Sequence, residues 1–98
     1  MARVSEIHLK DIGLDAAREV VGDGMAEEVE VITGPDSANR PAYYFSFLIE
    51  QDRDRQRAAL LRTRLAQKIR DKLVSRGDAH YPFIRVFGRA DWGKRLSA

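Results

Sequence analysis

The clearest pattern of hydrophobic and polar positions lies between residues 53 and 76. At the α-helical repeat its apolar residues fall on one arc, the stripe that a helix packed on a core needs. They are Ala58, Leu61, Leu65, Ala66, Ile69 and Leu73. Asp52 can cap the first amides of this helix, and Gly77 can end it in a left-handed conformation. The sequence therefore predicts one long amphipathic helix that buries this stripe.

Two segments before this helix alternate apolar and polar residues in the manner of β-strands. They are residues 27–33 and 42–50, and the turn-forming residues of segment 34–41 lie between them. The first segment places Val29 and Val31 on one face and Glu28, Glu30 and Ile32 on the other. The pattern predicts an antiparallel hairpin. Its face bearing Phe45 and Phe47 should meet the helix, because aromatic side chains bury the most apolar surface.

A third strand is predicted at residues 83–87, since Tyr81-Pro82 forces an extended backbone at its start. A strand, a helix and a strand in succession imply a right-handed crossover, with the third strand parallel to the second. Arg85 faces outward in this strand and can pair with Glu28 or Glu30 if the third strand lies beside the first. On this ground we expect the first strand to lie at the centre of the sheet.

The N-terminal part has two competing patterns. Residues 4–10 alternate as a short strand does, whereas apolar residues between positions 7 and 21 also recur at helical spacing. Gly13 indicates a break between them. We therefore expect a strand at residues 4–10 and a helix at residues 14–21, which Gly-Asp-Gly at residues 22–24 ends.

These elements predict an α+β fold, a two-layer single domain over residues 1–98, in the order helix-strand-strand-helix-strand. A tail starts at about residue 88, and Trp92 is its only large side chain able to dock it. With the extra N-terminal strand the arrangement is ferredoxin-like, and without it the order is similar to the bacterial KH-like arrangement. Both are analogies of fold alone, since the Gly-x-x-Gly signature of KH domains and the aromatic submotifs of RRM domains are absent from the sequence.

The composition is that of one globular domain, with 98 residues, 44% of them hydrophobic and 33% charged. The absence of cysteine excludes disulfides, thiolate metal sites and thiol nucleophiles, and it favours a reducing cytoplasm. No apolar run is long enough for a membrane span, and the first residues lack the apolar run of a signal peptide. We therefore expect a soluble, cytoplasmic protein with no membrane partner.

Charge is distributed unevenly along the chain. Residues 1–52 hold four cations and eleven acids, or −7, whereas residues 53–76 hold nine cations and two acids, or +7. Four of these cations form a strip beside the apolar arc of the helix: Arg53, Arg57, Arg64 and Lys68. We interpret the strip as a contact for RNA or DNA backbone without base-specific readout, to which Arg89, Lys94 and Arg95 can add. Its N-terminal end should project past the sheet, because the apolar stripe begins only at Ala58.

Two other interpretations use the same helix. In the first, the charges are a solvated face whose arginine and lysine stems cover the edge of the core. In the second, the protein is a protein–protein interaction module, either a homodimer or a small regulatory subunit. Such a module would contact its partner through Leu60 and Val74. Attraction between the acidic half of one molecule and a basic half of the other would orient the two.

Residues for catalysis or metal binding are sparse. His8 and His80 lie far apart in sequence, and neither has the spacing of a helical metal site. His80 lies near Asp78, with Asp91 further on, but no serine or lysine is paired with it. We therefore expect a non-enzymatic binding protein without a metal or a cofactor.

Two other segments resemble parts of phosphate or nucleic-acid sites. The loop at residues 34–41 contains Ser37, Asn39 and Arg40, but it lacks the glycine and lysine pattern of phosphate-binding loops. Tyr44 on the outer sheet face resembles a base-stacking position, yet Glu28 and Glu30 on that face repel phosphate. The loop is therefore expected to be a plain hairpin loop, and the helix the contact for nucleic acid.

Overall fold

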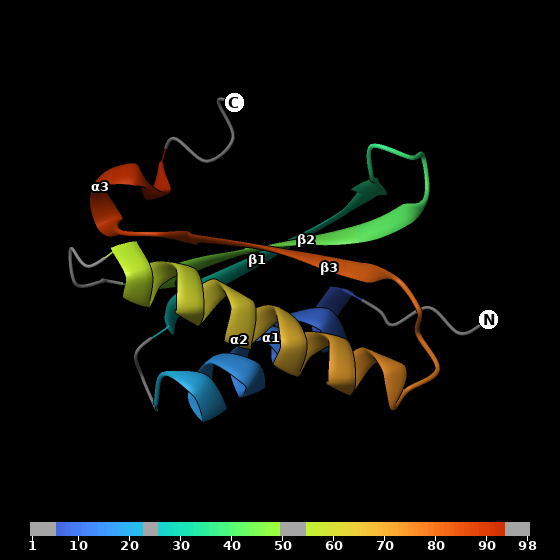
Figure 1. The fold of residues 1–98 in the computed structure, drawn as a ribbon, viewed down its shortest axis with the longest axis horizontal. Coiled ribbons are helices and arrows are strands. Elements are labelled where there is room, and N and C mark those ends of the chain that lie inside the picture. Colours follow the sequence, from blue (N-terminus) through green and yellow to red (C-terminus); the bar gives the residue numbers. More distant parts are fainter. Residues whose placement is uncertain (1–5, 23–25, 50–54, 94–98) are drawn as a thin grey trace.

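The computed structural model describes residues 6–22, 26–49 and 55–93, which form a layer of helices and a three-stranded sheet. The elements are α1 (Glu6–Val20), β1 (Ala26–Pro35), β2 (Pro41–Ile49), α2 (Arg55–Val74), β3 (Tyr81–Phe87) and the short α3 (Arg89–Trp92). Figure 1 shows α1 and α2 side by side on one face of the sheet. The predicted α+β class and the order helix-strand-strand-helix-strand are confirmed.

β2 is the central strand of the sheet, so the prediction that the first strand lies at the centre is wrong. β1 pairs with β2 antiparallel through the predicted hairpin, and β3 runs parallel to β2 after the crossover through α2. β2 is almost wholly buried, so it takes the position paired on both edges, whereas β1 with its glutamates lies at an edge. Arg85 is accordingly aligned with Ser46 and not with Glu28 or Glu30.

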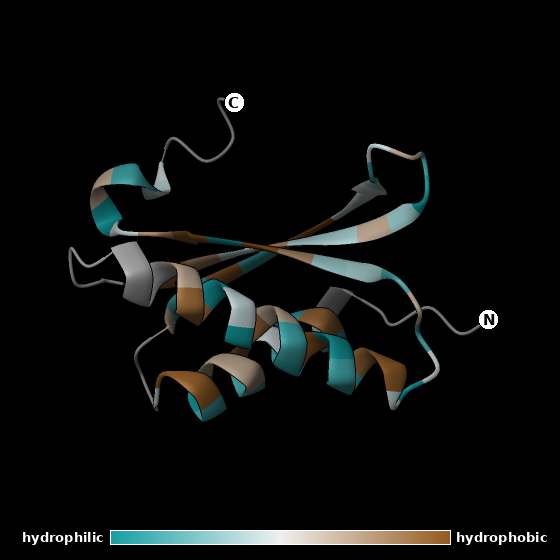
Figure 2. Cartoon of the chain, in the orientation of Figure 1, coloured by the Kyte–Doolittle hydropathy of each residue, from teal (hydrophilic) through white to brown (hydrophobic). Residues whose placement is uncertain are grey.

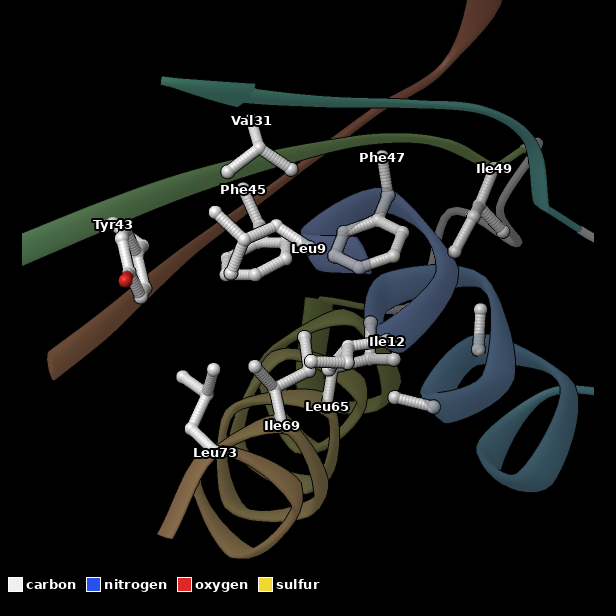
Figure 3. Close-up of a cluster of buried hydrophobic side chains, with 12 residues drawn as sticks. Leu9, Ile12, Val31, Tyr43, Phe45, Phe47, Ile49, Leu65, Ile69 and Leu73 are labelled. Atoms are coloured by element: carbon white, nitrogen blue, oxygen red, sulfur yellow. The ribbon is translucent and has the colours of Figure 1, made fainter. Parts of the chain in front are cut away.

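The core lies between the sheet and the two long helices (Figure 3). The predicted inward side chains of β2 and the centre of the apolar stripe of α2 are fully buried: Phe45, Phe47, Leu65, Ile69 and Leu73. Leu61 and Ala66 are half-buried, and the side chain of Ala58 lies outside the described residues. Figure 2 shows hydrophobic residues, in brown, recurring along both helices and in the middle of the sheet.

α1 is one continuous helix from Glu6, so the predicted strand at residues 4–10 is wrong for residues 6–10, and residues 4 and 5 lie outside the described residues. Its buried side chains follow helical spacing: Leu9, Ile12, Ala16 and Ala17. Gly13 does not break the helix. A Cβ at this position would lie 3.1 Å from Cγ1 of Val29 and 3.3 Å from Cδ2 of Phe45, so glycine permits close packing on the sheet. The described residues thus contain no N-terminal strand for a ferredoxin-like arrangement.

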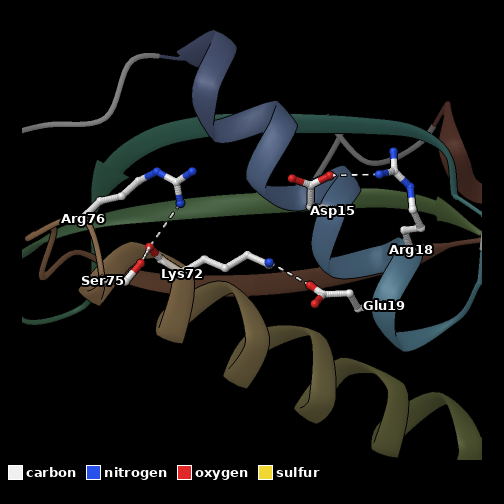
Figure 4. Close-up of polar contacts among 6 residues, drawn as sticks. All are labelled: Asp15, Arg18, Glu19, Lys72, Ser75 and Arg76. Carbon is white, nitrogen blue, oxygen red and sulfur yellow. Dashed lines mark hydrogen bonds and ion pairs between the residues drawn. The ribbon is translucent and has the colours of Figure 1, made fainter.

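Glycines end both long helices, as predicted. Gly22 follows α1 with a φ of 116°, while Asp23 and Gly24 lie outside the described residues. Gly77 has a φ of 77°; its amide donates to the carbonyl of Val74, and the next amide donates to Leu73, which is a Schellman motif. The side chains of Ser75 and Arg76 also donate to the carbonyl oxygen of Lys72, at 2.8 Å from the Ser75 hydroxyl and 3.4 Å from the Arg76 guanidinium (Figure 4). The cap predicted at Asp52 lies outside the described residues.

α3 replaces the first part of the predicted tail. It lies on the sheet face opposite α1 and α2 (Figure 1), and its Trp92 ring meets the Phe87 ring edge-on at 6.0 Å. This contact docks the segment as expected, and residues 94–98 lie outside the described residues. Within the described parts of the chain, no helix is long and apolar enough to cross a membrane.

Candidate functional site

α2 exposes cations on two flanks that have different neighbours. Arg64 and Lys68 border a hollow shared with α1, and we call them the α1-facing flank. Arg62 and Arg70 border a groove shared with β3, and we call them the β3-facing flank. All four side chains are exposed, and none forms an ion pair with another described residue. The helix therefore presents two basic surfaces.

The structure brings together two of the four residues predicted as a strip. Arg64 and Lys68 lie one helical turn apart, whereas Arg53 and the side chain of Arg57 lie outside the described residues. The hollow of about 330 Å³ beside the pair is also lined by Glu19, Val20, Gln67 and Asp71. Arg89 is not part of this surface, because it lies in α3 and donates to the carboxylate of Glu27, 3.0 Å from Nε. Lys94 and Arg95 lie outside the described residues.

Glu19 of α1 reduces the positive potential of the α1-facing flank. Its Oε2 lies 2.7 Å from Nζ of Lys72 (Figure 4). The hydrogen bond from Lys72 is the main cause that lowers the pKa of Glu19, and the charges of Lys72 and Lys68 lower it further. The carboxylate is therefore ionised at neutral pH, offsets the charge of Lys72 and lowers the potential at nearby Lys68. Periodicity could not reveal this contact, since it joins two helices that are far apart in sequence.

An open groove of about 610 Å³ lies along the β3-facing flank. Its walls come from α2 and β3: Arg62, Thr63, Ala66, Gln67, Arg70, Asp71, Tyr81, Pro82, Phe83 and Ile84. The guanidinium carbon of Arg70 lies 5.7 Å from the centroid of the Tyr81 ring, within the range of a cation–π contact. This flank therefore combines positive charge with an exposed aromatic side chain.

Tyr81 and Phe83 are not among the residues that the sequence predicts as functional, and neither are the contacts that their rings form. Tyr81 and Phe83 are two residues apart in β3, so both point to the sheet face away from the helices. Phe83 is aligned with Tyr44 of β2, the ring whose position in the sequence resembles a base-stacking position. The alternation of rings at positions 81 and 83 was a usable signal. Their neighbour could not be known without the strand register.

A buried polar cluster connects β2 to the turn after α2. The Tyr43 hydroxyl donates to Oδ2 of Asp78 at 2.5 Å, and Oδ1 of Asp78 accepts from the His80 amide at 2.9 Å and lies 2.6 Å from His80 Nδ1. The Tyr43 and His80 rings stack with centroids 4.4 Å apart. Asp78 is fully buried, and both of its oxygens are occupied by groups that hold this turn. Asp91 lies in α3, beyond the other end of β3, so it does not join His80.

The loop at residues 34–41 is closed on its own aspartate. Oδ1 of Asp36 accepts from the amides of Ala38 and Arg40, both at 2.8 Å, and Oδ2 lies 3.4 Å from Nε of Arg40. The Arg40 amide is the largest cause that lowers the pKa of Asp36. Asn39 has a φ of 61°, which asparagine tolerates better than most residues. The amide donors of Ala38 and Arg40 therefore serve the turn, as in a plain hairpin loop, whereas the side chain of Arg40 stays mostly exposed.

No match to this chain was found among protein-family models, curated proteins or solved structures. Within the described ranges, no group of three or more His, Asp or Glu side chains is placed to hold a metal ion. The exposed surfaces of α2 and of the sheet are the remaining candidates for a binding site.

Proposed function

We propose that this domain is a small non-enzymatic protein that binds nucleic acid, contacting the phosphate backbone through the exposed cations of α2. One observation carries the proposal: Arg62, Arg64, Lys68 and Arg70 are exposed on one helix and form no ion pair with other described residues. Cations on such a surface attract phosphates and release counterions when nucleic acid binds. Arginine suits this contact because its guanidinium can donate two parallel hydrogen bonds.

The proposed contact includes the strip predicted from the sequence, Arg53, Arg57, Arg64 and Lys68, and extends it to the β3-facing flank. The buried stripe of α2 packs the helix against the core, and the exposed cations project from its other sides. Because the contacts are to phosphate, affinity should depend strongly on salt and little on base sequence.

The test measures binding of unrelated RNA and DNA oligonucleotides by fluorescence anisotropy at low and moderate salt. The test variant replaces Arg62, Arg64, Lys68 and Arg70 with glutamine. The control variant replaces Lys10 and Arg18, two exposed cations of α1, in the same way. Circular dichroism checks that each variant is folded.

We expect the α2 variant to bind all sequences more weakly and to flatten the salt dependence, by roughly one unit of slope for each phosphate that it no longer neutralises. The α1 control should bind almost as the parent does. If the parent shows no salt-sensitive binding to RNA or DNA at low ionic strength, the proposed function is wrong.

A second candidate function is a protein–protein interaction module, either a homodimer or a small regulatory subunit that uses the same helix. The observation that favours it is the exposure of Leu60 and Val74, which are 49% and 60% exposed on α2. Apolar side chains that face solvent lose contact with water when another protein covers them.

The solution mass at several protein and salt concentrations tests the homodimer. A dimer held by opposite charges should dissociate as salt rises, whereas a dimer held by Leu60 and Val74 should not. A monomeric mass at high protein concentration and low salt would exclude the homodimer.

A further inference from the structure

Three aromatic rings are in contact at the hairpin end of the open sheet face. Tyr44 and Phe83 stack with centroids 5.1 Å apart and planes 14° apart, and Tyr81 meets Phe83 edge-on at 4.8 Å. The rings meet because Tyr44 is aligned with Phe83 in the parallel pairing, and Tyr81 points to the same face. We call these three residues the aromatic platform.

The aromatic platform is open to solvent. α1 and α2 cover the other sheet face, and α3 lies at the far end against Phe87 (Figure 1). Tyr81 is 46% and Phe83 37% exposed, although side chains of this size are usually well buried. Ile32, aligned with Tyr44 in β1, is also 46% exposed. A contiguous exposed aromatic surface on a small domain is typical of a binding surface.

Two arginines border the aromatic platform. Arg70 lies over the Tyr81 ring, and Arg40, whose side chain is 77% exposed, lines with it a hollow of about 410 Å³ beside Tyr81 and Phe83. The one acid of this hollow, Asp36, lies 3.4 Å from Nε of Arg40 and also accepts hydrogen bonds from the amides of its own loop. Asp36 therefore offsets the charge of Arg40, whereas Arg70 forms no ion pair with another described residue, and the border keeps one net positive charge. The border is therefore positive and complements phosphate.

We infer that the aromatic platform binds single-stranded nucleic acid, with bases stacked on its rings and phosphates held by Arg70 and Arg40. This inference rests on the proposed function and specifies unpaired strands as the substrate class. Aromatic rings next to arginines bind single strands with little sequence preference, since every base has a flat π-face. Bases of a duplex stack on one another and cannot lie on a sheet surface. The platform has room for roughly two or three bases.

Two acidic residues on the same sheet face confine a bound nucleic-acid strand to the hairpin end of the sheet. Glu30 is aligned with Ser46 and Glu28 with Leu48, so both acids lie toward the α3 end and away from the platform. A nucleic-acid strand that extends beyond the rings can instead pass Arg70 at the β3 edge of the sheet and enter the groove of the β3-facing flank. Repulsion by the glutamates therefore orients the strand and does not exclude it.

The test uses the full chain and three probes of equal length: oligouridylate, oligothymidylate and a blunt DNA duplex. The main variant combines Tyr81→Leu with Phe83→Leu, which keeps apolar bulk and removes both exposed rings. Leu14→Ala is the matched control, because Leu14 is 38% exposed on α1, far from the platform. Thermal melting and circular dichroism establish that each variant is folded, and Tyr81→Phe retains a ring at the same position.

The parent should bind both single strands more tightly than the duplex. The double leucine variant should lose single-strand affinity by roughly tenfold or more, while its salt slope and duplex affinity stay unchanged. Tyr81→Phe and Leu14→Ala should bind nearly as the parent does. This combination separates stacking from phosphate binding, since removal of cations changes the salt slope.

Two results would overturn the inference and leave backbone binding through α2 in place. One is equal affinity of the parent for single strands and duplex, and the other is undiminished single-strand binding by the folded double leucine variant. If that variant also turns a dimer into a monomer, the platform is an interface between copies of the chain. No binding of any probe by the parent would instead remove the proposed function together with the inference.

Discussion

The two flanks of α2 carry similar cations, yet their surroundings differ. The α1-facing flank lies beside Glu19, whose carboxylate is bonded to Lys72 and remains ionised. The β3-facing flank borders an open groove and continues through Arg70 to the exposed ring of Tyr81. One helix thus has a partly neutralised basic surface on one side and a basic, aromatic surface on the other.

This difference teaches that the charge count of a helix does not locate a binding site. The same kind of cation is offset where a neighbouring helix supplies an acid, and it is reinforced where a neighbouring strand supplies aromatic rings. What distinguishes the flanks is the element packed beside each of them.

The largest effect is expected from Leu65→Ala, because both flanks depend on the packing of α2 against the core. Leu65 is fully buried, so its truncation should lower the free energy of unfolding by about 2–5 kcal/mol. Arg64→Ala removes the exposed neighbour and should cost less than about 0.5 kcal/mol. Denaturant unfolding followed by circular dichroism measures both. Equal losses would contradict the assignment of buried and exposed positions on α2.

The β3-facing flank also depends on the turn that Asp78 holds between α2 and β3. Asp78→Ala leaves the buried Tyr43 hydroxyl without this acceptor and should lower the free energy of unfolding by about 1–3 kcal/mol. Asp71→Ala removes an exposed acid of α2 and serves as the control. Denaturant midpoints that are the same for the two variants would show that the buried cluster contributes no stability.

The α1-facing flank depends on how closely α1 packs on the sheet. Gly13→Ala places a methyl group 3.1 Å from Val29 and 3.3 Å from Phe45, and should cost about 1–3 kcal/mol of stability. Gly93→Ala is the control, since a Cβ there meets nothing within 4 Å. Thermal unfolding compares the two. A neutral Gly13→Ala would mean that Val29 and Phe45 give way at a cost no greater than the roughly 1 kcal/mol that alanine gains over glycine inside a helix.

Paired charge variants compare the flanks directly. Arg62→Gln with Arg70→Gln should weaken single-strand binding by roughly tenfold, whereas Arg64→Gln with Lys68→Gln should weaken it less, because Glu19 already offsets that flank. Anisotropy titrations at two salt concentrations measure both variants. A larger loss for the α1-facing pair would reverse the ranking of the two flanks.

The smallest effect concerns Glu19→Gln. Hydrogen bonding to Lys72 lowers the pKa of Glu19 below its ordinary value of 4.5 in the folded state. Its stabilising contribution is therefore present above about pH 4.5 and is lost as pH falls through the lowered pKa. The stability difference between parent and variant should shrink on acidification, as melting temperatures over a pH series would reveal. A difference independent of pH would contradict the pairing.

Glu19→Gln also acts on the comparison of the flanks at neutral pH. Removal of the carboxylate leaves Lys72 without this partner, raises the positive potential beside the α1-facing flank and should raise the contribution of that flank to nucleic-acid binding. Glu27→Gln is a suitable control, since Glu27 pairs with Arg89 on α3 instead.

Much of the fold could be predicted from local patterns. Leu65, Ile69 and Leu73 recur at helical spacing, and Gly77 ends α2 in the expected left-handed conformation. Phe45 and Phe47 lie two residues apart and face the helices as predicted. These features depend on the periodicity of helices and strands and on the conformational freedom of Gly77. Both can be recognised in a short stretch of sequence.

The candidate site could be predicted only in part. Arg64 and Lys68 were identified because they follow the helical repeat. Arg70 acquired its importance from Tyr81, which only the α2–β3 contact brings near it. The tertiary structure likewise decided the strand order and the continuity of α1 through Gly13. It also decided the pairing of Glu19 with Lys72 and the stacking of Tyr44 on Phe83. Each depends on contacts between residues distant in the chain, and local periodicity carries no information about which of those contacts has the lowest free energy.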